Sequence, residues 1–382
     1  MLHPTSRRNF LLTAGAAGFI AACAPAATPA SPSAPPGPPA PAPNEPWRKE
    51  WDDLVAAAKR EGALALVTFE SSSYRAGAEA FEQAFPGIKV DLTSISPSNF
   101  NTKLQGERKA EVYSYDISTN QFGVTGFRWV SDGFLSPVRP LLFRPDVLAD
   151  ASWRGGYEAG FLDKGKQFGF SSFWSKQRPI WINTDMVGPN EIRTVQDLLN
   201  PKWKGKMVAG DPRNLGGGKF VTVLRRATND EFLGKLYKDQ EVVLLRELRQ
   251  LAESMFRGRY AIGIEAMNDA VIDEFFAQGL GKNLKPVEME EINYILSSSG
   301  VLFHFSRGPH PNAAKLFANW VLTKEGATIW SKAAGLNSRR TDVPSLFPDV
   351  DPLSGRKYLN LDYEEFSPEL IKSQEIARAL LT

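Results

Sequence analysis

The sequence predicts an α/β fold in which mainly parallel sheets are flanked by helices. Apolar strand-like segments alternate with segments of helical periodicity, and this alternation is typical of parallel strands joined by crossover helices. The alternation occurs in two sets, one from Trp47 and another from about Phe168. Residues 47–382 are enough for two domains, and they show no fixed-period repeat that would indicate a solenoid or a propeller.

The first set begins with an amphipathic helix that ends at Gly62. Its apolar face is formed by Trp47, Trp51, Leu54, Val55 and Ala58. The elements expected next are a strand at 63–70, a helix at 74–87, a strand at 88–95, a helix at 99–109 and a strand at 115–120. This order predicts a parallel sheet that is covered on both faces.

The second set has the same alternation. Its expected strands lie at 178–187, 207–211, 260–265 and 284–289, and its expected helices at 194–206, 218–228, 244–258 and 269–279. A late strand at 300–308 and two helices between 310 and 335 complete the pattern. We therefore expect a second sheet with its own helices.

The N-terminus has the layout of an export signal. Arg7 and Arg8 precede an uncharged apolar run, Phe10–Ala22, that is too short to span a membrane comfortably. The stretch "SRRNFLL" resembles a twin-arginine signal, and "IAAC" resembles the lipobox of bacterial lipoproteins. We expect residues 1–22 to be removed and Cys23 to be lipidated, which anchors the protein in the periplasm or on the outer face of the cytoplasmic membrane. The alternative is a cysteine buried at the end of a core helix.

Composition after Cys23 excludes several classes of function. Residues 23–46 are rich in Pro and Ala and predict an extended linker. The whole chain has 45 basic and 43 acidic residues, and loss of Arg7 and Arg8 leaves 43 of each, so nothing indicates nucleic acid as a partner. With one cysteine and only His304 and His310 beyond the signal, we expect no disulfide, metal site or cofactor.

Four loops follow predicted strands, where open α/β sheets bind ligands. The first contains Ser71, Ser72 and Ser73, whose hydroxyl and backbone N–H groups precede a helix and could bind an anion. The alternative is capping of that helix. The second contains Gly216, Gly217, Gly218 and Lys219. A lysine in a first helical turn is unfavourable unless an anion lies nearby. The alternative is a flexible connection, and the pattern is not a Walker A loop.

The other two loops carry amides and carboxylates. Asn120 and Gln121 follow the predicted strand at 115–120 and could donate or accept hydrogen bonds. Glu265, Asn268 and Asp269 follow the strand at 260–265. Capping of the next helix by Asn268 or Asp269 is the alternative.

Several longer stretches resemble one family of bacterial receptors. They are "WINTDMV" at 181–187, "DLLNPKWKGKMVAGDP" at 197–212, "SMFRGRYAIGI" at 254–264 and the segment 309–335. Together they resemble the solute-binding proteins of ABC importers, of the type II periplasmic class and its iron(III)-type branch. The resemblance implies two α/β lobes joined by two crossover strands, near 168–182 and 300–306. It places lobe 1 at 47–167 plus 303–345 and lobe 2 at 168–302 plus 346–382.

The resemblance also implies a ligand between the lobes. Near the expected hinge, Ser172 and Trp174 could contact it, although packing between the lobes explains Trp174 as well. Arg339 matches a loop near the cleft and could grip a carboxylate or phosphate; solvated surface charge is the alternative. At the iron-ligand positions Asn120, Met267 and Asn268 replace the carboxylate and the tyrosines of iron-binding members. Ferric ion prefers phenolate and carboxylate oxygen.

The expected function is therefore capture of a small anionic organic or oxyanionic solute by hinge closure. The solute would pass to an ABC permease. We expect the protein to be a binding protein and not an enzyme, and we expect it to be a monomer. A ferric receptor that uses a synergistic anion, an exported cofactor-dependent enzyme or hydrolase, and a sensor without transport remain alternatives. Against an enzyme, the sequence contains no GxSxG and no HExxH motif.

Overall fold

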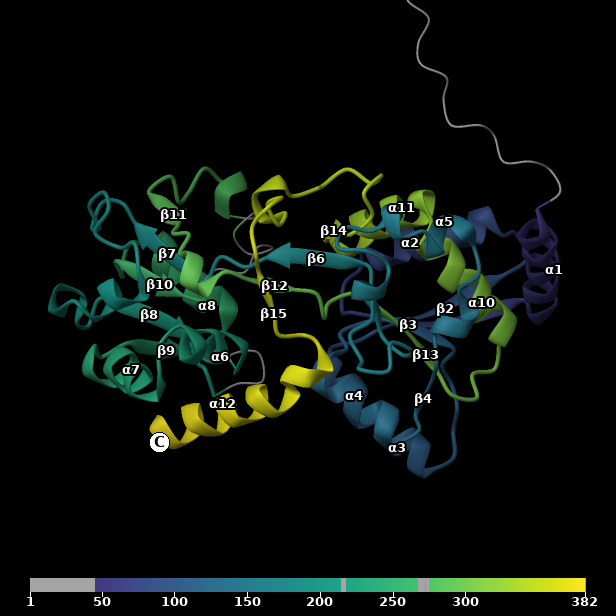
Figure 1. Ribbon diagram of the computed structural model, residues 1–382, viewed down its shortest axis with the longest axis horizontal. Helices are drawn as coiled ribbons and strands as arrows, with labels where there is room; N and C mark the ends of the chain where they lie inside the picture. Colours follow the sequence, from purple (N-terminus) through teal and green to yellow (C-terminus); the bar gives the residue numbers. More distant parts are fainter. Residues whose placement is uncertain (1–44, 214–217, 267–271, 273–274, 382) are drawn as a thin grey trace, which may run out of the picture. The chain divides into compact units, whose positions relative to one another are not determined.

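Three β-sheets organise the computed structural model, which describes residues 45–213, 218–266, 272 and 275–381 (Figure 1). Residues Asn44–Thr382 belong to one compact unit. Two of the sheets are large and are covered by helices, and the third consists of short strands. The predicted α/β fold is confirmed.

The first sheet has the strand order β2-β1-β3-β13-β4, with β5 pairing the other end of β13. Its strands are β1 (Ala63–Thr68), β2 (Lys89–Ser94), β3 (Ile117–Thr119), β4 (Leu135–Ser136), β5 (Phe170–Ser171) and β13 (Val301–Phe305). β1 pairs β2 and β3 in parallel, whereas β13 is antiparallel to β3, β4 and β5. The sheet is more mixed than predicted because β13 returns late in the chain and runs in the opposite direction.

Helices bury apolar side chains on both faces of this sheet. They are α1 (Pro46–Glu61), α2 (Tyr74–Ala84), α3 (Pro97–Lys109), α4 (Gly123–Ser131), α5 (Pro145–Leu148), α10 (Pro311–Val321) and α11 (Lys324–Ala334). Leu64 and Leu66 of β1 join one core cluster and Val67 joins another, as side chains that alternate across a strand must. Helix α2 packs closely on α11 at Gly77, where a Cβ would lie only 2.8 Å from the Trp330 ring. The close contact therefore requires a residue without a side chain.

The second sheet has the order β11-β7-β10-β8-β9. Its strands are β7 (Ile180–Asn183), β8 (Met207–Gly210), β9 (Val243–Leu245), β10 (Ile262–Ile264) and β11 (Leu284–Pro286), and its helices include α6 (Gly218–Ala227), α7 (Asp230–Gly234), α8 (Leu248–Phe256) and α12 (Ser367–Leu380). β8 lies parallel between β9 and β10, and β7 is antiparallel to both β10 and β11. Met207 and Ala209 join one core cluster and Val208 the other.

Two predicted helices of this region are wrong in part. The stretch 194–206, expected to form a helix ended by its proline, instead forms two 3₁₀ turns, Val195–Leu199 and Pro201–Trp203. Thr194 and Asp197 close a capping box on the first turn, and the Asn200 side chain caps the second, so each turn ends locally. The helix expected at 244–258 begins only at Leu248, because the preceding residues form β9.

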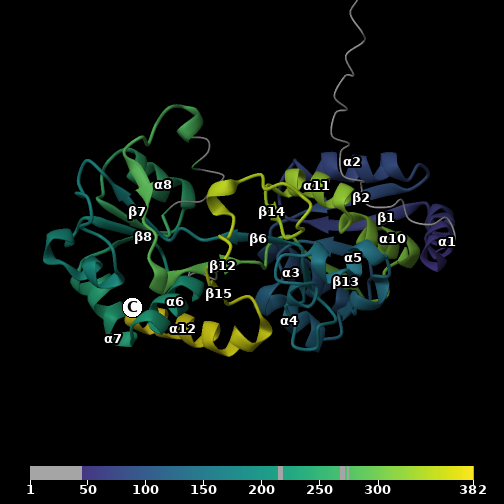
Figure 2. The same ribbon diagram turned by 45° about the horizontal axis from the view of Figure 1, so that its top comes forward.

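The third sheet links the two larger ones. Its strands, in the order β14-β6-β12-β15, are β14 (Asn337–Ser338), β6 (Phe173–Lys176), β12 (Tyr294–Leu296) and β15 (Leu359–Asn360). β6 follows β5 and precedes β7, whereas β12 follows β11 and precedes β13, so these strands are the two crossovers. They pair antiparallel and lie side by side (Figures 1 and 2). The second crossover therefore precedes the expected position at 300–306, which is occupied by β13 itself.

The C-terminal segment returns to the second sheet. After the 3₁₀ turn Pro348–Val350, β15 pairs with β12, and a second turn, Glu364–Phe366, leads into α12. Helix α12 packs beside α6 (Figure 1). Among the described residues, no helix has the length and apolar character of a membrane span.

Candidate functional site

Polar side chains gather beyond the carboxyl ends of strands in both large sheets. Ser71–Ser73 follow β1, and Asn120 and Gln121 follow β3. In the second sheet, Lys219 lies beyond β8 and Glu265 directly follows β10. These are the edges where loops and helix N-termini are available to a ligand.

Asn120 joins the loops of the first sheet. The residue is 1 % exposed, and its Nδ2 donates to the Thr68 and Ile95 carbonyl oxygens, both at 3.1 Å. Its Oδ1 accepts the Gln121 backbone N–H at 2.7 Å. The Asn120 side-chain amide, which was predicted to bind solute, is therefore hydrogen-bonded to backbone groups of the protein. Gln121 is the exposed member of the pair.

The three serines form a small hydroxyl network. Ser71 Oγ and Ser73 Oγ are 2.7 Å apart, and Ser73 Oγ donates to the Ala333 carbonyl oxygen at 2.6 Å. Ser72 is exposed. Ser73 occupies the N-cap position of α2 without a side-chain capping bond, so capping does not account for this run. Phe69 lies two residues before Ser71, directly after β1, and is 46 % exposed; no sequence pattern had indicated it.

Lys219 has a partner that the sequence did not indicate. Its Nζ donates to Ser298 Oγ at 3.0 Å and forms an ion pair with the Asp362 carboxylate. The Lys219 side chain is 20 % exposed and that of Asp362 only 1 %. A lysine in the first turn of this helix predicted a nearby anion, and the protein itself supplies that anion through Asp362. No local motif could have revealed it, since Asp362 comes from the distant C-terminal segment.

Glu265 lies in the same charged group. Its Oε1 accepts a hydrogen bond from the Tyr294 hydroxyl at 2.6 Å, and its backbone has a φ of 48°, in the left-handed region. Burial raises the pKa of Glu265 to about 7, although the Tyr294 hydrogen bond and the charge of Lys219 act in the opposite direction. A non-glycine residue held in this conformation with a shifted pKa is a frequent feature of functional sites.

Ser298 brings the two edges together. Its hydroxyl accepts from Lys219, and its backbone carbonyl oxygen accepts the Phe122 N–H at 3.0 Å. Nearby, the Val301 N–H donates to the Asn120 carbonyl oxygen at 3.0 Å. The segment between β12 and β13 therefore contacts the predicted ligand loops of both sheets.

The residues predicted near the hinge make a separate set of contacts. Trp174 Nε1 donates to Asp351 Oδ1 at 3.1 Å, and the Ser172 carbonyl oxygen accepts the Arg339 N–H at 2.8 Å. The Arg339 guanidinium donates to the carbonyl oxygens of Ser171, Arg154 and Gly156 at 2.8–2.9 Å. Burial lowers its pKa to about 10. Arg339 thus stabilises the fold here and is not positioned as the predicted grip on a solute.

Some predicted residues cannot be placed. Gly216, Gly217, Asn268, Asp269 and Cys23 lie outside the described residues. Gly218 is buried and begins α6, and its carbonyl oxygen accepts from Thr222 Oγ1 at 2.8 Å. Within the described ranges, no group of three or more His, Cys, Asp or Glu side chains is arranged to hold a metal ion.

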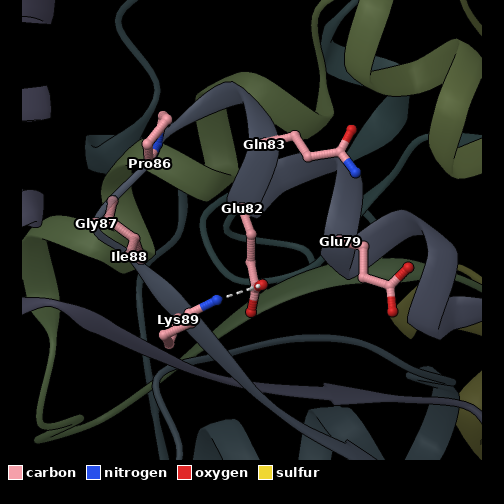
Figure 3. Close-up of a pocket in the computed structure, with 7 residues that line it drawn as sticks. All are labelled: Glu79, Glu82, Gln83, Pro86, Gly87, Ile88 and Lys89. Carbon is pink, nitrogen blue, oxygen red and sulfur yellow. Dashed lines mark hydrogen bonds and ion pairs between the residues drawn. The ribbon is translucent and has the colours of Figure 1, made fainter.

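A surface hollow of about 390 Å³ lies away from this site (Figure 3). It lies between the last turns of α2 and the start of β2, at the opposite end of α2 from the serines. Lys89 reaches across it to Glu82 at 3.2 Å (Figure 3). The hollow lies at the amino end of β2, whereas the candidate site lies beyond the carboxyl ends of the strands.

The family of the chain follows from its central half. A sequence model of the family described as bacterial extracellular solute-binding protein matches residues 146–336. The chain belongs to this family. The matched residues include both crossover strands, β6 and β12, and all five strands of the second sheet.

Solved structures share the fold of this solute-binding protein. Iron-bound HitA of Pseudomonas aeruginosa is 14 % identical with a TM-score of 0.64, and 84 % of this chain covers 99 % of that one. Trichodesmium IdiA (FutA), in complex with iron and citrate, is 14 % identical with a TM-score of 0.66 and the same coverage. AfuA of Actinobacillus pleuropneumoniae, with fructose-6-phosphate bound, is 18 % identical with a TM-score of 0.57, over 82 % of this chain and 97 % of that one. These likenesses establish the two-lobe fold of periplasmic binding proteins.

A curated relative matches over a shorter region. An uncharacterized protein of Haemophilus influenzae is 23 % identical over 199 residues, which are 48 % of this solute-binding protein and 54 % of the relative. The chain therefore spans about half the length of the curated relative that it matches.

Proposed function

We propose that this protein is the extracytoplasmic receptor of an ABC importer, which captures a small solute with an anionic group and delivers it to the permease. Membership of the solute-binding family supports the receptor role. The observation that carries the site is the contact of Lys219 with Ser298, which brings a partly exposed cation of the second sheet to the loops of the first. Such a role needs no covalent chemistry.

Capture would proceed by hinge closure. β6 and β12 cross between the large sheets as an antiparallel pair, and the Ser297–Ser298 segment directly follows β12. A small rotation about this pair would move Ser71–Ser73, Gln121 and Phe69 relative to Lys219 and Glu265. Closure of two lobes around a ligand is the usual motion of periplasmic binding proteins.

The anionic character of the solute rests on Lys219 and on the helix N-termini of α2 and α6. Two structural neighbours have iron bound and one has fructose-6-phosphate bound, so a ferric ligand and a phosphate-bearing solute are both represented among similar folds. Addition of ferric ion with citrate or carbonate separates them. A strong visible charge-transfer band would contradict the non-ferric proposal.

The direct test is to identify the solute. Mass spectrometry of small molecules that copurify with the protein, followed by a thermal-shift titration, should reveal a compound that raises the melting temperature. Lys219→Met should weaken its binding at least tenfold. Arg226→Met is the matched control, because Arg226 lies on the same helix and pairs with Glu369 outside the site. Equal affinities of the two variants would contradict the role of Lys219.

Membrane attachment is a separate part of the proposal. We propose that Cys23 is lipidated after export of residues 1–22, that residues 23–46 act as a tether, and that the receptor is a monomer. Cys23→Ser should shift the protein from the membrane to the soluble fraction, and light scattering of the soluble form should give the mass of one chain. Unchanged membrane attachment would contradict the anchor.

The boundaries of the lobes are proposed as lobe 1 at 47–167 plus 303–345 and lobe 2 at 168–302 plus 346–382. The packing of α12 on α6 supports placing the end of the chain in lobe 2. The separate core clusters on the two large sheets support the division itself, but Phe170, Val301 and Leu302, at the proposed boundaries, pack in the clusters of the first sheet.

A further inference from the structure

The Asp362 carboxylate is surrounded by donors that converge on it. Oδ2 accepts the backbone N–H groups of Ser297 at 2.7 Å and Ser298 at 2.9 Å. Oδ1 pairs with the Lys219 ammonium. Two successive backbone N–H groups and an ammonium form the kind of concavity in which proteins bind oxyanions. Here the anion is a side chain of the protein.

We infer that Asp362 is a specificity-determining residue, which occupies an oxyanion site at the edge of the solute cleft and neutralises Lys219 there. This inference rests on the proposed function, because it concerns the same lysine. With the site filled and its charge balanced, small inorganic oxyanions such as phosphate and sulfate gain little from binding. The binding free energy of a larger solute must then come from contacts elsewhere in the cleft.

The geometry leaves Lys219 one donor for such a solute. An ammonium group has three N–H donors. Ser298 Oγ and Asp362 account for two of them, and the side chain keeps 20 % of its exposure. Lys219 can therefore orient an anionic group of the solute without offering it the full attraction of an unpaired cation.

Asp362 is held from both sides, so its position is preorganised. Just before it, β15 pairs with β12, and just after it the Tyr363 hydroxyl donates to the Ala159 carbonyl oxygen at 3.0 Å. The Glu364 N–H donates to the Leu162 carbonyl oxygen at 2.9 Å. These bonds hold the C-terminal segment against the rest of the fold, which keeps the carboxylate in the site.

The test uses inorganic phosphate as the probe and two variants of the full mature chain. Asp362→Ala vacates the site, whereas Asp362→Asn removes the charge and keeps the shape. We expect Asp362→Ala to bind phosphate at least tenfold more tightly than the wild type, measured by calorimetry and by the shift in melting temperature. Asp362→Asn should show a smaller gain of at least threefold, because Lys219 is no longer neutralised.

Asp351→Ala is the matched control, since Asp351 lies in the same segment and pairs with Arg154 at 3.2 Å. It should leave phosphate affinity unchanged. In the double variant Lys219→Met/Asp362→Ala, the gain should disappear. If circular dichroism shows that Asp362→Ala is unfolded, Asp362→Asn decides alone. Phosphate affinity within threefold of wild type in every folded Asp362 variant overturns the inference.

The proposed function fails by a different result. It is tested by the native solute on the wild-type protein, whereas the inference is tested by phosphate on the variants. A gain in phosphate affinity without any native anionic solute would retain the oxyanion site and reject the proposed solute class. If a native anionic solute is found but no Asp362 variant gains phosphate affinity, the proposed solute class is retained and the oxyanion site is rejected.

Discussion

The ligand edges of the two large sheets differ in how they use polar groups. At the first sheet, Asn120 and Ser73 are neutral and donate to backbone carbonyl oxygens of the protein. At the second, Lys219, Asp362 and Glu265 are charged or titratable and lie within one electrostatic group. The polar groups of the first edge therefore mainly hold its own loops, whereas the second edge carries the charged groups that we propose bind the solute.

The difference has an energetic reason. A buried neutral amide costs little once each of its hydrogen bonds is made. A buried charge needs a partner of opposite sign or shifts its pKa until it becomes neutral. Asp362 takes the first course through Lys219, and Glu265 takes the second, since its pKa rises to about 7. Substitutions at the two edges should therefore change the free energy of unfolding by different amounts and with a different dependence on pH.

The largest effect is expected at the charged edge. Lys219→Met leaves the Asp362 carboxylate buried without its cation, and the free energy of unfolding should fall by about 3 kcal/mol in urea denaturation at pH 7. Lys219→Met/Asp362→Asn removes both charges and should recover at least half of that loss. Additive losses in the double variant would show that the two side chains are not coupled.

A smaller loss is expected at the neutral edge. Asn120→Ala removes the side-chain donor to the carbonyl oxygens of Thr68 and Ile95 and the acceptor of the Gln121 N–H, although Thr68 keeps the Ile95 N–H as a donor. The loss should cost about 2 kcal/mol of unfolding free energy. The neighbouring exposed residue provides the control, since Gln121→Ala should stay within about 0.5 kcal/mol of wild type. If Asn120→Ala is as stable as Gln121→Ala, the scaffold role of Asn120 is wrong.

The pH dependence of stability should separate the edges further. The Glu265 carboxyl has a folded pKa of about 7 and an ordinary value of 4.5. Below pH 4.5 it is protonated in both states and has no effect. Between pH 4.5 and 7 the unfolded chain loses the proton first, so this group lowers stability as pH rises, and the full loss persists above pH 7.

Glu265→Gln should remove that slope and be more stable than wild type by about 2 kcal/mol above pH 7, as thermal or urea unfolding across the range would show. Glu288→Gln is a control in which the effect of pH on stability has the opposite sign. Hydrogen bonds and charges from Lys176 and Arg356 hold the pKa of Glu288 below its usual value, so its contribution is lost as pH falls. Parallel pH profiles for wild type and Glu265→Gln would contradict the assignment.

The smallest effects should lie among the serines. Ser73→Ala removes the hydrogen bond to the Ala333 carbonyl oxygen and should cost about 1 kcal/mol of unfolding free energy. Exposed Ser72 should tolerate alanine with no measurable loss, so any effect of Ser72→Ala on solute affinity would reflect direct contact. A loss of stability in Ser72→Ala equal to that in Ser73→Ala would mean that the serine network extends further than its hydrogen bonds indicate.

Local patterns predicted the elements best where one face of an element decides its packing. The helix Pro46–Glu61 follows from the spacing of Trp51, Leu54 and Ala58, and it ends at Gly62 with a φ of 73°, as expected. The region 194–206 shows the converse, because its apolar spacing is helical but its own capping side chains divide it into short turns. Short strands such as β9 and β12 carry too few residues for a period to be recognised.

The sequence by itself determined the alternation of strands and helices and the places of Lys219, Glu265 and the serines just beyond strands, because these depend on residues that are near one another in the chain. The family resemblance implied two crossover strands, but the second of them is β12 and not the expected segment at 300–306. Only the tertiary structure decided how those side chains are used. It commits Asn120 and Arg339 to carbonyl oxygens and brings Asp362 to Lys219. The reason is that buried polar groups must find partners in space, and those partners come from distant segments whose identity no local pattern encodes.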